Sequence, residues 1–183
     1  PVWDPIRMES LQIVNMTMNK YPDKFVPFIM PPFNDDNIDG YPTVDAETLK
    51  EMLAVYPGLF KGYGEIGLYE RGDHGGPKGA KALAPDSERL KEIYPIIKEN
   101  NLVIYFHLGE GQKESFENAL RENRDINFIF HGDQLVTYSD KGQNLGAIDE
   151  ILSNNPNVYY GVDELYGGEW LLKPEISKNK FIS

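Results

Sequence analysis

The chain has 183 residues and a formal net charge of −11, from 18 basic and 29 acidic side chains. A chain this acidic repels phosphate backbones, so nucleic acid is not an expected partner. It has no cysteine, which excludes disulfides and thiolate sites and leaves histidine and carboxylate side chains to hold any metal.

No apolar run approaches the roughly 18–20 residues of a membrane span. We therefore expect no membrane span and, by default, a soluble cytoplasmic protein. The sequence begins at Pro1 rather than at a methionine. We accordingly expect that the true N-terminus has been cut away, and a missing signal peptide is weak evidence about the compartment.

The first half of the chain alternates between helical and strand patterns. Apolar residues at helical spacing predict a helix over 4–20, and a strand follows over 25–30, with Pro27 as an interruption. A second helix is predicted over 44–55. The next strand, over 61–68, contains glycines, which weaken a strand unless another part of the backbone must approach closely.

The second half continues the alternation. Asp86 stands where a helix N-cap belongs, before a helical stripe of apolar residues over 90–97. The run LVIYFHL is apolar except for His107, which is typical of a parallel strand buried on both faces. The remaining predicted elements are a strand over 102–108, a helix over 112–122, a strand over 126–131, a helix over 145–153 and a strand over 158–162.

Five strands separated by helices indicate an α/β fold built from βαβ units, in which neighbouring strands run parallel with right-handed crossovers. An open doubly wound sheet and a piece of a (β/α)8 barrel both fit this count of strands.

Two of the three histidines end consecutive predicted strands. His107 follows VIYF and His131 follows FIF. Because the carboxyl ends of parallel strands converge on one face, these histidines could share a ligand, and neutral imidazole is the commonest metal ligand. The alternative is that both are strand-end histidines bonded to backbone carbonyls.

Glu65 lies inside the segment GYGEIGL. Burying a carboxylate among glycines and apolar residues is costly unless it is paired or bound to metal. A metal-bridging role is therefore one interpretation. The other is an exposed glutamate, or one paired with Lys61 or Arg71.

Five segments resemble successive barrel strands of the amidohydrolase superfamily. GYGEIGLYE resembles its fourth strand, LVIYFHLGEG its fifth, INFIFHGD its sixth, NPNVYYGV its seventh and YPDKFVPFIMPP its third. The order and spacing match over roughly residues 10–165. The resemblance implies an incomplete (β/α)8 TIM barrel in which strands three to seven are recognisable, with residues 1–183 as a single partial domain.

The resemblance also implies a metal site. Glu65 takes the place of the bridging carboxylate, and His107 and His131 take the places of two histidine ligands. The implied cofactor is one or two divalent ions, zinc first and manganese, iron or nickel as alternatives. The implied reaction is hydrolysis of an amide, lactone or ester in a small-molecule substrate by a metal-activated water, or a related decarboxylation. A homo-oligomer is compatible with this reading.

The sequence also departs from the family. The superfamily's first strand carries His-x-His and its eighth carries an aspartate that acts as general base, and neither motif is found here. A whole barrel needs about 250 residues, so we expect a fragment of a longer protein. Tyr69 follows GEIGL where TatD-like enzymes have aspartate, and Leu108 follows His107 where they have arginine, which favours the amidohydrolase-2 group. The competing interpretation is a non-catalytic or fragmentary barrel relative that binds a small ligand or a partner.

Further residues are candidates for the same face. Arg71, Glu110 and Asp133 are predicted to bind substrate, because they lie in loops that follow the strands of the site. Asp163 is a candidate for the missing general base, although a cap of the following turn is the simpler interpretation. His74 is expected to be a solvated loop residue. We interpret four aromatic residues as core packing: Tyr105, Phe106, Tyr159 and Tyr160.

Overall fold

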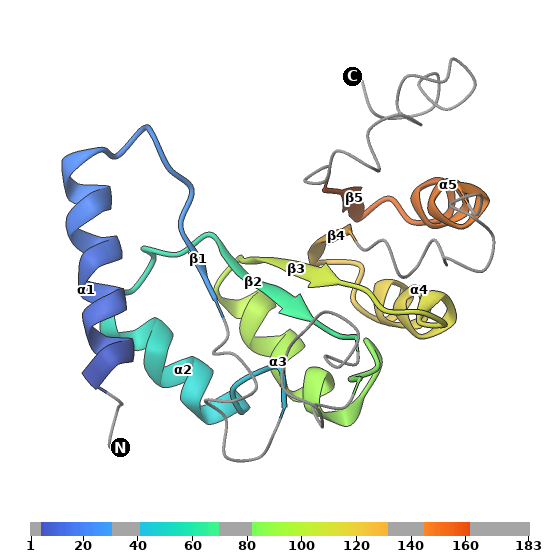
Figure 1. Ribbon diagram of the computed structural model, residues 1–183, viewed down its shortest axis with the longest axis horizontal. Helices are drawn as coiled ribbons and strands as arrows, with labels where there is room; N and C mark the ends of the chain where they lie inside the picture. The colour runs from blue at the N-terminus through green and yellow to red at the C-terminus, as the bar shows by residue number, and fades with distance from the viewer. Residues whose placement is uncertain (1–4, 31–40, 70–81, 132–144, 162–183) are drawn as a thin grey trace.

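The computed structural model describes residues 5–30, 41–69, 82–131 and 145–161 (Figure 1). In these ranges helices and strands alternate, which confirms the predicted α/β fold. The elements are α1 Pro5–Lys20, β1 Phe28–Ile29, α2 Ala46–Val55, β2 Gly62–Gly67, α3 Glu88–Glu99, β3 Val103–His107, α4 Lys113–Glu122, β4 Asn127–His131, α5 Leu145–Asn154 and β5 Val158–Tyr160.

The five described strands form one parallel sheet in the order β1-β2-β3-β4-β5. Each crossover therefore steps in the same direction along the sheet. A doubly wound sheet instead reverses its strand order at a switch point. The order thus excludes the doubly wound alternative for the described strands and fits a segment of a barrel. In Figure 1 helices α2, α3, α4 and α5 follow one another in an arc along the strands.

The first strand is much shorter than predicted. Only residues 28 and 29 pair with β2, instead of a strand over 25–30. Pro27 explains the difference, because it has no N–H to donate to a ladder. Its carbonyl still accepts a hydrogen bond from the backbone N–H of Lys61 at 2.9 Å.

The hydrophobic core lies between the sheet and its helices. In β3 and β4 every second side chain points into it, which is the period of two expected of strands. Phe116 of α4 meets the rings of Phe106, Phe128 and Phe130, with centroids 5.2 to 6.0 Å apart. All four of these side chains have no measurable exposure.

The opposite face of the sheet is only partly covered within the described residues. Val103 and Tyr105 are half-buried there, and Tyr159 is 56% exposed. The predicted burial of β3 on both faces is therefore wrong for this part of the chain. The core assignment holds for Phe106 but is wrong for Tyr159, because alternate residues of a strand face opposite sides.

The helix caps differ from the prediction at one position. Ser87, and not Asp86, is the N-cap of α3. The carboxylate of Asp86 instead accepts a hydrogen bond from the side-chain amide of Asn118 at 3.0 Å, so it links α4 to the start of α3.

Among the described helices, none combines the length and the apolar character that crossing a bilayer requires.

A buried amide ties together the amino end of the sheet. The Asn157 side chain, just before β5, donates to the carbonyls of Leu120 at 3.3 Å, Asn123 at 3.1 Å and Ile126 at 3.1 Å. Its backbone carbonyl accepts from Phe128 at 2.9 Å. Asn157 therefore joins β5 to the end of α4 and the start of β4.

Candidate metal centre

Both predicted histidines lie at the carboxyl edge of the sheet. His107 is the last residue of β3 and His131 is the last residue of β4, and the two are partners in the strand register. They are only 6% and 4% exposed, and their ring centroids lie 4.2 Å apart. The pairing of strand ends therefore brings the two imidazoles together, as predicted.

Glu65 reaches this edge from an irregular point in β2. Tyr63 and Ile66 pair with residues 104 and 106, so two residues of β2 stand opposite the single residue Tyr105. A bulge of this kind redirects a side chain. Gly64 makes it possible: its φ is +131°, and a Cβ there would lie 2.4 Å from the Tyr105 carbonyl oxygen. This close approach of the backbone accounts for a glycine inside the strand.

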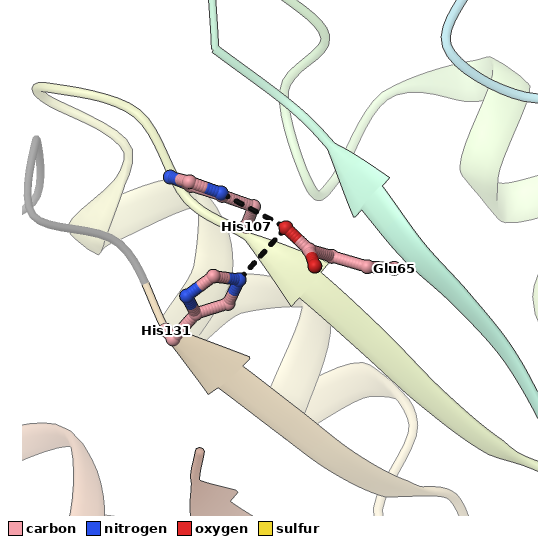
Figure 2. A group of neighbouring side chains, drawn as sticks. All are labelled: Glu65, His107 and His131. Carbon is pink, nitrogen blue, oxygen red and sulfur yellow. Dashed lines mark hydrogen bonds and ion pairs between the residues drawn. The ribbon is translucent and has the colours of Figure 1, made fainter. Parts of the chain in front are cut away.

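The three side chains converge on one carboxylate oxygen (Figure 2). Oε1 of Glu65 lies 3.0 Å from Nδ1 of His107 and 2.8 Å from Nε2 of His131. The alternative pairing with Lys61 is not observed, because the Lys61 ammonium donates to the Gly58 carbonyl at 2.9 Å. The alternative in which the histidines bond only to backbone carbonyls does not describe this arrangement either.

The charge of Glu65 is stabilised by this geometry. Hydrogen bonding to His107, followed by hydrogen bonding to His131, lowers the pKa of its carboxyl group from 4.5 to about 2, against the opposing effect of burial. Glu65 is therefore ionised at neutral pH. Its side chain remains 34% exposed, so the cluster is open to solvent on the carboxylate's side.

The cluster has the composition of a metal site. One ligand atom from each of the three residues lies within 4.8 Å of the others. Two imidazoles and one carboxylate are the protein ligands of several catalytic zinc sites, which leave a further position for water. The same donors in a facial arrangement suit ferrous iron. Glu65, His107 and His131 could therefore hold a divalent ion.

Two tyrosines flank the histidine pair. The ring centroid of Tyr69 lies 4.4 Å from that of His107, and the centroid of Tyr105 lies 5.2 Å from that of His131. Tyr105, interpreted as core packing, is instead half-buried beside the site. Its position directly before Phe106 carries the signal, because Phe106 faces the helices and its neighbour must face the other way.

Sequence reasoning missed Gln112, a buried side chain near the same edge. It lies at the N-cap of α4 and is 8% exposed. Its Nε2 donates to the carbonyls of Leu68 at 2.9 Å and Leu83 at 3.1 Å, and its Oε1 accepts from the backbone of Gly109 at 2.8 Å. No sequence motif marks it, because its partners are backbone atoms.

The other predicted site residues are less defined. Glu110 is exposed in the loop that follows β3. Arg71, His74, Asp133 and Asp163 lie outside the described residues, so their predicted roles stay predictions.

No protein-family model and no curated protein matches the sequence. Among solved structures, the chain is similar to an uncharacterized TIM-barrel protein from Bordetella bronchiseptica, at 16% identity and a TM-score of 0.52. The similarity covers 82% of this chain and 47% of that protein, so this chain spans about half the length of its structural relative. At this identity the similarity shows the fold alone. The described part of the chain is an α/β fold that matches half of a TIM barrel.

Proposed function

We propose that this chain contributes to a metal-dependent hydrolase of the amidohydrolase superfamily. The enzyme would hydrolyse an amide, lactone or ester of a small molecule, or catalyse a related decarboxylation. The observation that carries the proposal is the convergence of His107 Nδ1 and His131 Nε2 on one oxygen of Glu65 at the carboxyl edge of a barrel-like sheet. Active sites of TIM-barrel enzymes lie at this edge. The five strand motifs of the sequence support the same family.

Each residue of the cluster would have a distinct task. Both histidines would offer a neutral nitrogen from a fixed strand end, which restricts the ligands to one orientation. Glu65, ionised through its contacts with the histidines, would supply negative charge next to them. A bound divalent ion, with zinc as the first candidate, would lower the pKa of water and polarise the substrate carbonyl.

We propose that residues 1–183 form one partial domain, in which residues around the cluster supply the acid–base and substrate-binding groups. Arg71, Glu110 and Asp133 are proposed to contact the substrate. Asp163 is the candidate for the general base. These assignments rest on their position after the strands in the sequence.

The first test is a charge-matched pair of variants. Glu65→Gln removes the carboxylate of the cluster. Asp125→Asn removes an exposed carboxylate outside the site, whose oxygen lies 2.6 Å from the Lys98 ammonium. Metal content is measured after dialysis against zinc or manganese, and turnover is measured on amide, lactone and ester substrates. We expect Glu65→Gln to lose metal and turnover and Asp125→Asn to keep both. Equal metal content in the two variants would make Glu65 a structural residue.

A non-catalytic ligand-binding relative is the second candidate. One observation favours it. All three titratable side chains of the described cluster are proposed metal ligands, so the cluster itself supplies no separate general base. Metal binding without turnover on any substrate class would support this candidate over the hydrolase.

A further inference from the structure

A second layer of contacts surrounds the histidine that ends β3. Gly67, at the end of β2, is the register partner of His107. Because Gly67 has no side chain, the Tyr69 ring can fold back over it: a Cβ on Gly67 would lie 3.1 Å from Cε1 of Tyr69. The Tyr69 ring thereby occupies the place next to the His107 ring.

The loop after β3 holds Tyr69 from the other side. A Cβ on Gly109 would lie 3.0 Å from both Cα and Cβ of Tyr69. The backbone of Gly109 is in turn fixed by its hydrogen bond to Gln112, at 2.8 Å. A shift of this loop would therefore be transmitted to Tyr69 and through its ring to His107.

Gln112 connects three segments of the chain through one side chain. Its single carboxamide joins Leu68 at the end of β2, Leu83 in the segment before α3 and Gly109 after β3. It does so from an N-cap position, where glutamine is not a preferred residue, and its side chain makes no bond that caps the helix. Its hydrogen-bonding capacity is thus directed to the strand ends that carry Glu65 and His107.

We infer that Gln112 is a positioning residue of the metal centre: its buried carboxamide locks the ends of β2 and β3 together, so that Tyr69 is held against His107 and the imidazole is fixed for metal binding. This inference rests on the proposed metal site and deepens it. Groups that orient metal ligands typically change metal affinity by about 10- to 100-fold when they are removed.

The chain offers a matched control at the opposite end of the sheet. Asn157 is also a buried amide with three hydrogen bonds to backbone atoms, but its bonds lie at the amino end. Gln112→Met and Asn157→Leu each replace a buried amide with an apolar side chain of similar size. Both are expected to lower the thermal unfolding midpoint, so a loss of stability alone cannot separate them.

The experiment is a cobalt titration of the unaltered chain and of both variants, followed by the visible absorption of bound Co²⁺. We expect Gln112→Met to bind Co²⁺ about 10-fold more weakly, with a shifted spectrum, and Asn157→Leu to match the unaltered chain in both respects. If Gln112→Met does not fold, Gly109→Ala tests the same contact, because the added Cβ must displace Tyr69; we expect a shifted spectrum there as well.

The outcomes separate the two claims. Co²⁺ affinity and spectrum that stay unchanged in Gln112→Met, or in Gly109→Ala where that variant replaces it, would overturn the positioning role and leave the metal site in place. Equal weakening in Gln112→Met and Asn157→Leu would also overturn it, because the effect would then follow stability. Failure of the unaltered chain to bind Co²⁺ would overturn the metal site itself and this inference with it.

Discussion

The two ends of the same sheet bury polar groups in different ways. At the amino end, the Asn157 amide donates to three backbone carbonyls. At the carboxyl end, the Gln112 amide also bonds to backbone atoms, but Glu65, His107 and His131 meet one another through their side chains. Hydrogen bonds to backbone hold segments together, whereas contacts between side chains can be exchanged for contacts with a ligand.

We propose that this difference separates stability from metal binding within one small sheet. TIM barrels show the same division, with stability at the amino face and active sites at the carboxyl face. If the division holds here, variants at the carboxyl end should change metal binding more than stability, and variants at the amino end should do the reverse.

The largest expected effect is at the carboxyl end. His131→Ala removes one of three proposed ligands, so we expect the affinity for Zn²⁺ to fall at least about 100-fold, equivalent to roughly 2.7 kcal/mol. Calorimetric titration measures the affinity, and far-UV circular dichroism should show the helices retained. Zinc affinity close to that of the unaltered chain would exclude His131 from the site and contradict the proposed difference between the two ends of the sheet.

At the amino end we expect a large effect on stability alone. Asn157→Leu removes the amide that donates to three backbone carbonyls, which should lower the free energy of unfolding by about 2–3 kcal/mol. For a chain of this size the unfolding midpoint should then fall by roughly 5–10 °C. Zinc affinity should not change. A midpoint within 1–2 °C of the unaltered chain, on the order of 0.5 kcal/mol, would mean that Asn157 does not stabilise this end.

A smaller effect is expected for a carboxylate near the carboxyl end that is not part of the cluster. Asp45 caps α2, and its side chain accepts from the Thr48 backbone at 2.8 Å. We expect Asp45→Ala to lower stability by about 1 kcal/mol at pH 7 with no change in metal affinity. A change in metal affinity would show that the cluster depends on more of this edge than its three residues.

The same cap predicts a pH dependence. The hydrogen bond from Thr48 lowers the pKa of Asp45 below its ordinary value of 3.8. A carboxyl group with a lowered pKa in the folded state contributes stability above its unfolded pKa and loses it as the pH falls through the folded value. The difference between Asp45→Ala and the unaltered chain should therefore shrink below pH 3.8, as chemical denaturation at several pH values would show. A constant difference down to pH 2 would contradict it.

Sequence reasoning was strongest where a residue's position in a strand decides its neighbours. His107 and His131 each end an apolar run, and parallel pairing then brings them together. The glycines around Glu65 were unusual for a strand unless the backbone approached closely there, and Gly64 does approach Tyr105 closely.

The sequence was weaker where the outcome depends on contacts between distant segments. Asp86 was predicted to cap its own helix, but it bonds to Asn118 in the next helix. Gln112 carries no signal in the sequence, because its role depends on three backbone atoms that only the fold brings near it. The exposure of Tyr159 depends on what covers its face of the sheet, which a strand pattern does not reveal.

The metal centre is tested most directly by a calorimetric titration of the unaltered chain with Zn²⁺, followed by thermal unfolding with and without the ion. We expect saturable binding with one or two ions per chain. We also expect zinc at about 100 times its dissociation constant to stabilise the fold by roughly 2.7 kcal/mol. Absence of saturable binding, or binding that is unchanged when Glu65 is replaced by glutamine, would contradict the claim that the carboxyl edge of this sheet is a metal centre.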